Sequence, residues 1–119
     1  MTCFWDGLRL KLNITHVDNR TFIRHLQQNN SYQHLKHVKW NNTLLSVKAR
    51  QENYHHIKNF DIGTITRGYD CSSCDPFLIL ICALFRKTIY HTYNGHLITY
   101  SINSKDPIIY CNSNTSHFE

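Results

Sequence analysis

The chain has 119 residues, of which 41% are hydrophobic and 13% aromatic, and it contains four glycines and two prolines. One domain with its own hydrophobic core fits this length, and the composition excludes disordered, collagen-like and linker-like chains. Thirteen Lys and Arg against eight Asp and Glu give a net charge of +5. That balance permits an acidic partner, but the basic residues are scattered as on an ordinary solvated surface.

The first half of the chain is expected to consist of helices and loops. Phe4, Leu8 and Leu12 recur every four residues, and this spacing predicts a helix that begins after Thr2 as its N-cap. The other helices of this half are expected over 21–28 with Asp18 or Asn19 near the cap, over 32–37, and from Ser46 to about Asn59 with Val47, Tyr54 and Ile57 on one face.

The second half predicts one buried helix followed by strands. Asp75 followed by Pro76 favours a helix start, and residues 77–85 are apolar on every face, so this helix should be central to the core. Strands are expected over 88–93, 97–102 and 107–111, with a hairpin turn at Asn94 and Gly95. Residues 1–119 therefore predict a single α+β domain in which N-terminal helices and a central buried helix pack on a small antiparallel sheet.

The cysteines and the apolar runs indicate the compartment. Five cysteines at irregular spacing favour free thiols in a reducing environment. Residues 2–12 mix charged residues into what would be the apolar core of a signal peptide, so no such peptide is expected. The longest apolar run, 76–85, is about half the length that spans a bilayer, so no membrane span is expected.

Cys3 and His117 are the candidate catalytic pair. Cys3 falls in the first turn of the first predicted helix, where the positive helix end stabilises a thiolate, and backbone N–H groups at Thr2 and Cys3 can hold an oxyanion. His117 follows the last strand and can act as general base. Glu119, two residues later, lies on the same face if the strand continues and can orient the imidazole.

Several runs of the sequence resemble a known family. Residues 2–8, TCFWDGL, look like the nucleophile helix of papain-like cysteine proteases, in which a cysteine precedes an aromatic residue at a helix start. The C-terminal half more narrowly resembles OTU (ovarian-tumour) deubiquitinases in the order of its pieces: Gly68-Tyr69, DPFLIL at 75–80, the strand pair 88–102, PIIY at 107–110 and His117-Phe118. The Asn- and Ile-rich composition is also similar to OTU-like proteins of large DNA viruses.

This resemblance implies a function. Cys3 would be the nucleophile and His117 the general base, and Glu119 stands where the family often has Asp or Asn. The implied activity is hydrolysis of isopeptide bonds of ubiquitin or a ubiquitin-like modifier, without metal or organic cofactor, by a cytoplasmic monomer, or in the host cytoplasm if the protein is viral. An Asp-Gly loop that usually precedes the family's cysteine has no counterpart here, because the sequence reads Met1-Thr2-Cys3.

Other functions stay open at this point. The chain can be a non-catalytic ubiquitin-binding or protein-binding module of the same fold. It can also be a basic nucleic-acid binder that stacks bases on its strand tyrosines, Tyr90, Tyr93, Tyr100 and Tyr110, although alternating strand aromatics more often form core and cross-strand pairs.

Further candidate residues rank below the Cys3–His117 pair. Cys71 and Cys74 have metal-ligand or redox spacing, but the sequence has no second such pair, so two loop thiols are the simpler interpretation. His96 is an alternative general base just after the hairpin turn. Cys82 and Cys111 are expected to serve packing.

Overall fold

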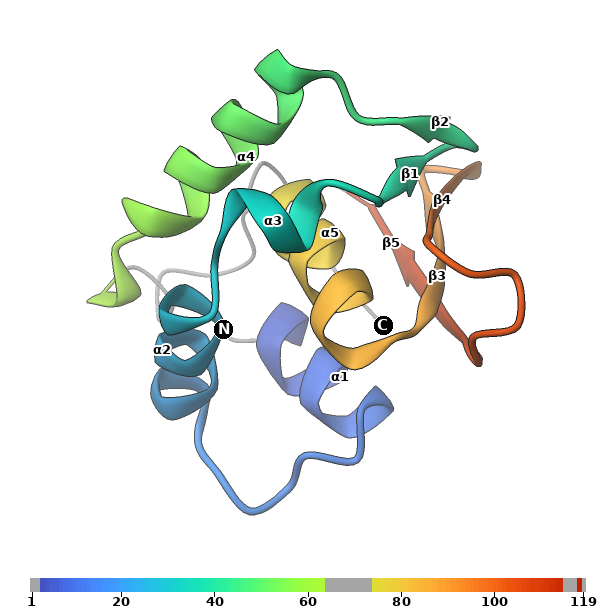
Figure 1. The fold of residues 1–119 in the computed structure, drawn as a ribbon. Helices are drawn as coiled ribbons and strands as arrows, with labels where there is room; N and C mark the ends of the chain where they lie inside the picture. The colour runs from blue at the N-terminus through green and yellow to red at the C-terminus, as the bar shows by residue number, and fades with distance from the viewer. Residues whose placement is uncertain (1–2, 64–73, 115–117, 119) are drawn as a thin grey trace.

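The computed structural model describes residues 3–63, 74–114 and 118 (Figure 1). These residues form five α-helices and a five-stranded sheet with strand order β2-β1-β4-β3-β5. The helices are α1 (Cys3–Lys11), α2 (Asn19–Gln28), α3 (Tyr32–Leu35), α4 (Val47–Lys58) and α5 (Cys74–Phe85). The strands are β1 (Lys39–Trp40), β2 (Thr43–Leu44), β3 (Thr88–Tyr93), β4 (His96–Ser101) and β5 (Ile108–Ser113). The α+β class is therefore confirmed.

The sheet is mixed, so the prediction of a small antiparallel sheet is wrong. Strands β3 and β4 pair antiparallel across the predicted turn, where Asn94 and Gly95 have φ of 49° and 84°. Strand β5 instead pairs parallel with β3 on its other side. The connection from β4 to β5 passes the start of β3, where the Thr88 N–H donates to the Pro107 carbonyl at 2.9 Å. Strand β5 therefore begins beside Thr88 and runs in the same direction as β3.

A short hairpin in the first half was not expected from the sequence. Strands β1 and β2 pair antiparallel, and β1 also pairs with β4. The two residues between them, Asn41 and Asn42, both have positive φ, at 51° and 66°. Asparagine tolerates this conformation better than most residues, so the Asn pair allows a tight turn without glycine.

Two of the helix caps predicted for the first half are confirmed, whereas Thr2, the cap predicted for the first helix, lies outside the described residues. Asp18 accepts a hydrogen bond from the Thr21 N–H at 2.8 Å, and Ser46 accepts one from the Ala49 N–H at 3.1 Å. These side chains satisfy backbone donors that the first helical turn leaves without partners. The predicted common face of α4 is only partly correct, because Ile57 is buried but Val47 is 60% exposed.

Helix α5 is the centre of the core, as predicted. Residues 77–82 are at most 2% exposed. The helix contacts α3 and α4 as well as strands β3 and β4, and Figure 1 shows it between the other helices and the sheet. It begins at Cys74, so Asp75 lies inside the first turn, where its carboxylate accepts a hydrogen bond from the Tyr100 hydroxyl. No helix in the described part of the chain has the length and apolarity that crossing a membrane requires.

Candidate functional site

Phe4 and Phe118 bring the first helix and the last described residue into contact. Their ring centroids are 4.8 Å apart and their planes are inclined by 72°, which is a favourable edge-to-face arrangement. Both side chains are buried, Phe118 to 2% exposure. Phe118 is therefore packed against the N-terminal turn of α1.

Two further features fix the position of Phe118. Its backbone forms an antiparallel β-bridge with Ser113, the last residue of β5. Its ring also lies against Gly7 of α1, where a Cβ atom would stand 3.3 Å from the ring Cδ1 atom. Glycine therefore allows α1 to approach the ring more closely than a residue with a side chain would.

The predicted catalytic residues mostly lie outside the described part of the chain. Thr2, His117 and Glu119 belong to that group, as does the side chain of Cys3, although Cys3 is the first residue of α1. Phe4 and Phe118, which follow Cys3 and His117 directly in the sequence, are described and are in contact. The structure therefore describes the sequence neighbours of the candidate pair, Phe4 and Phe118, and not the two reactive side chains themselves.

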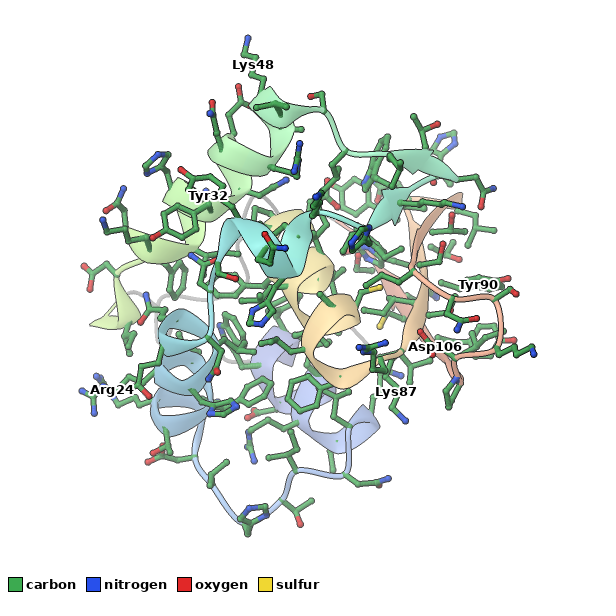
Figure 2. All side chains as sticks on the ribbon, in the orientation of Figure 1. Arg24, Tyr32, Lys48, Lys87, Tyr90 and Asp106 are labelled. Atoms are coloured by element: carbon green, nitrogen blue, oxygen red, sulfur yellow. The ribbon has the colours of Figure 1, made fainter. Side chains whose placement is uncertain are left out.

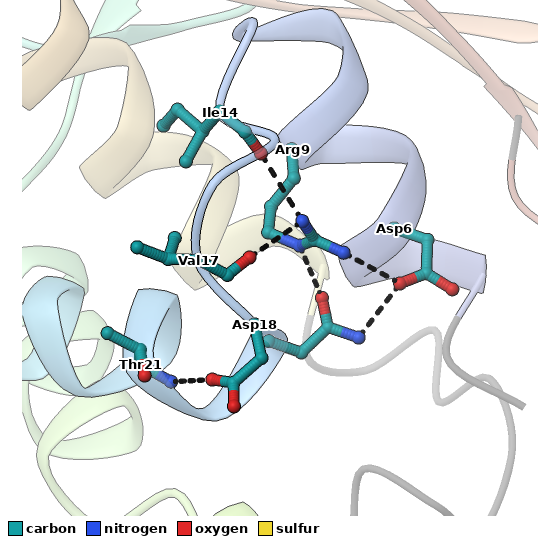
Figure 3. A network of polar contacts seen from close by, with 7 residues as sticks. Asp6, Arg9, Ile14, Val17, Asp18 and Thr21 are labelled. Atoms are coloured by element: carbon teal, nitrogen blue, oxygen red, sulfur yellow. Dashed lines mark hydrogen bonds and ion pairs between the residues drawn. The ribbon is translucent and has the colours of Figure 1, made fainter.

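A network of polar contacts holds α1 in place (Figure 3). The Arg9 guanidinium donates to the backbone carbonyl of Val17 at 2.9 Å and to the Asn19 side chain at 2.7 Å. It also reaches the carbonyl of Ile14 and the Asp6 carboxylate, both at 3.3 Å. The Asn19 amide donates to the same Asp6 carboxylate at 2.9 Å. This network ties α1 to the following loop and to the start of α2.

His91 and Ser113 form a buried polar pair that sequence reasoning missed. The His91 Nε2 atom lies 2.5 Å from the Ser113 hydroxyl, on neighbouring strands β3 and β5. Burial lowers the pKa of His91, and the nearby Asp75 carboxylate partly opposes this effect. The signal was present in the sequence: His91 has the strand parity of Ile89, which is buried.

Two cysteines are core residues, as predicted. Cys82 in α5 and Cys111 in β5 are buried free thiols. Burial raises the pKa of Cys82 to about 12 and that of Cys111 to about 11. Neither thiol is suited to act as a nucleophile, because the reactive form is the thiolate.

The described residues do not support the alternative metal site, the alternative general base or the tyrosine stacking surface. Cys71 lies outside the described residues, and within them no group of three or more His, Cys, Asp or Glu side chains could hold a metal ion. His96 is exposed at the start of β4. Tyr100 is fully buried, whereas Tyr90 and Tyr110 pack edge to face with centroids 5.6 Å apart across β3 and β5. The four tyrosines therefore do not form one stacking surface.

Two of the exposed basic side chains lie far apart on the surface. Arg24 on α2 and Lys48 on α4 extend outward at well-separated points of the molecule (Figure 2). Lys48 pairs with Glu52 of its own helix, at 3.9 Å. Exposed pairs of this kind contribute little to stability.

Comparisons with family models, with curated proteins and with solved structures found no match to this chain.

Proposed function

We propose that the chain is a small OTU-type, papain-like cysteine hydrolase that removes ubiquitin or a ubiquitin-like modifier from lysine. The contact between Phe4 and Phe118 is the observation that carries this proposal. Consecutive Cα atoms are about 3.8 Å apart, so covalent connectivity keeps Cys3 beside Phe4 and His117 beside Phe118. The contact therefore supports a pairing between two residues that lie near opposite ends of the sequence.

The proposed reaction has two steps. The Cys3 thiolate attacks the isopeptide carbonyl carbon, and the tetrahedral intermediate collapses when His117 gives its proton to the departing lysine amine. The product of this step is a thioester between Cys3 and the modifier. His117 then removes a proton from water, which attacks the thioester and releases the modifier carboxylate and the free thiol.

The surrounding groups have supporting roles in this proposal. Backbone N–H groups at Thr2 and Cys3 stabilise the oxyanion of both tetrahedral intermediates, and the positive end of α1 favours the thiolate. Glu119 accepts a hydrogen bond from the His117 ring and orients it. The enzyme would act in the cytoplasm, or in the host cytoplasm if it is viral, as a monomer without metal or organic cofactor.

The described polar contacts suit a site of this kind. Arg9 and Asn19 fix α1 at its C-terminal half, while Phe118 packs against its first turn. A nucleophile on a helix that is held at both ends keeps its position relative to a base on another segment. The raised pKa values of Cys82 and Cys111 also remove these two thiols as competing nucleophiles.

A ubiquitin probe with a C-terminal electrophile tests the proposal. We expect covalent labelling of the wild-type chain and no labelling of Cys3→Ala. Cys111→Ala is the matched control, because it removes a buried thiol and should leave labelling intact. His117→Ala should abolish turnover of a ubiquitin–lysine isopeptide substrate, whereas Glu119→Gln should reduce it only partly.

This probe, together with binding assays for ubiquitin and RNA, separates the alternatives. Reversible ubiquitin binding without labelling would identify a non-catalytic module of the same fold. Retention on RNA that falls steeply with salt, without ubiquitin binding, would identify a nucleic-acid binder. Equal turnover by wild type and His117→Ala would remove His117 from the mechanism.

A further inference from the structure

His91 is an ionisable side chain in a core that is mostly apolar, in which Thr88 and Ser113 are the other polar residues buried among the described residues. It is 2% exposed, and its register partners are Ile98 on β4 and Cys111 on β5. Burial of a polar ring costs free energy unless the ring finds hydrogen-bond partners. An aliphatic residue would fill this site without that cost. Packing alone therefore does not account for a histidine at this position.

The ring has one hydrogen-bond partner. Its Nε2 atom lies 2.5 Å from the Ser113 hydroxyl. Its Nδ1 atom is buried and has no partner among the described residues. In the neutral ring one nitrogen carries the proton and the other a lone pair, so one of these two groups stays unsatisfied. Within the described residues, the buried imidazole of His91 therefore makes a single hydrogen bond, to Ser113, and leaves one nitrogen without a partner.

His91 contacts both Ser113 and Phe118. The Phe118 ring centroid lies 5.7 Å from that of His91, and the Phe118 backbone bridges to Ser113. These two residues flank positions 114–117 in the sequence, and His117 is the last of these positions. Hence one buried side chain contacts the residues on both sides of the segment that contains the proposed general base.

We propose that His91 is a positioning residue for His117, acting through the Ser113 hydroxyl and the Phe118 ring. This inference rests on the proposed function, since it assigns a role relative to the general base. A displacement of about 1 Å at a reacting group can cost about 100-fold in rate. Loss of the hydroxyl contact should therefore lower the rate of the chemical step more than it lowers substrate binding.

Ser113→Ala is the principal test, because it removes the hydroxyl and leaves the buried imidazole in place. On a ubiquitin substrate with a C-terminal fluorophore, we expect kcat to fall by about 10- to 100-fold and KM to stay within about twofold. Ser113→Thr retains a hydroxyl and should recover most of the lost kcat. Thr88→Val is the matched control, since it removes a buried hydroxyl from the other end of the β3–β5 pair and should leave kcat unchanged.

A second measurement is independent of ubiquitin. The rate of Cys3 alkylation by iodoacetamide, followed by peptide mass spectrometry between pH 5 and 9, reports the thiolate that a nearby imidazole stabilises. In Ser113→Ala the midpoint of this profile should move upward, toward the value of about 8.5 for an ordinary thiol. His91→Gln, which can still bond to Ser113, should shift the profile less than His91→Leu.

The outcomes separate the two proposals. Wild-type turnover with an unchanged kcat in Ser113→Ala would overturn the positioning role and leave the proposed function standing. Absence of turnover, together with rapid Cys3 alkylation at pH 6 that Ser113→Ala slows, would support the positioning role and reject ubiquitin as substrate. Slow alkylation of wild-type Cys3 at pH 6 would overturn both.

Discussion

The ring of Phe118 packs against the ring of Phe4 across almost the full length of the sequence, with centroids 4.8 Å apart. Phe118 is thereby a core residue, although it stands next to the last position of the sequence. Terminal residues are usually poorly ordered unless packing ties them down. The contact with Phe4 thus ties Phe118 to α1 through the hydrophobic core.

The first prediction concerns how much the buried Phe118 side chain contributes to the free energy of unfolding. Phe118→Ala should reduce the free energy of unfolding by about 3–5 kcal/mol, because it leaves a cavity beside Phe4 and Gly7. Phe118→Leu should cost less, since it fills part of that space. Urea unfolding at pH 7.5 measures both values. The labelling rate with the ubiquitin probe should fall in the same order, and unchanged labelling of Phe118→Ala would separate the packing of Phe118 from the activity.

The second prediction concerns Gly7. Replacement of a helical glycine by alanine usually stabilises a helix by about 1 kcal/mol. Here the added methyl group would meet the buried Phe118 ring at 3.3 Å, so we expect no gain from Gly7→Ala in the wild-type background. In the Phe118→Leu background the same substitution should be stabilising. A double-mutant cycle with a coupling energy below about 0.5 kcal/mol would contradict this close approach.

The sequence predicted local structure well where one side chain determines it. Asp18 and Ser46 cap their helices, and Asn94 with Gly95 adopts positive φ, because these residues satisfy backbone demands almost independently of the rest of the chain. The all-apolar run of α5 predicted its central position for a similar reason, since it offers no polar face to solvent.

Non-local structure was harder to predict. The parallel pairing of β5 with β3 depends on the side of the sheet to which the chain returns after β4, and residues 102–107 carry no pattern that specifies it. The β1–β2 hairpin is two residues long on each strand, too short for alternation to show. For the candidate site, Cys3 and His117 stay predictions, because the Cys3 side chain and His117 lie outside the described residues. The sequence did not indicate the His91–Ser113 pair, because a hydrogen bond between two strands depends on their register.

The third prediction concerns the network of polar contacts through which Arg9 holds α1. Arg9→Met removes hydrogen bonds to Asn19 and Val17 and leaves their polar groups unsatisfied in a part-buried region. We expect a loss of about 1–3 kcal/mol in the free energy of unfolding. Arg24→Met on the exposed surface of α2 is the control and should change stability by less than about 0.5 kcal/mol. Equal losses in the two variants would show that Arg9 acts only through its net charge.

The fourth prediction concerns thiol accessibility. Because burial raises the pKa of Cys82 to about 12 and that of Cys111 to about 11, almost no thiolate forms at either residue at pH 8. Iodoacetamide should leave both unmodified in native buffer and should modify both in urea, as peptide mass spectrometry can show. Native modification of Cys111 within minutes would mean that β5 opens locally on that timescale.

The fifth prediction concerns the pH dependence of stability. Burial lowers the pKa of His91 in the folded chain below the unfolded value of about 6.5, although the Asp75 carboxylate opposes this shift. Between these two pKa values the unfolded chain binds more protons than the folded chain, so the free energy of unfolding rises with pH. The stability that neutral His91 contributes is fully present above about pH 6.5 and is lost as the pH falls through the folded-state pKa of His91.

His91→Gln should therefore flatten the decline in stability between pH 7.5 and pH 5.5. Urea unfolding at several pH values in this window measures the slope for wild type and variant. The window lies above the acid range in which Asp18, whose pKa is lowered by its bond to the Thr21 N–H, changes charge. His96→Gln at the exposed start of β4 is the comparison variant. A slope in His91→Gln as steep as in wild type would show that His91 is not the group that couples protonation to unfolding.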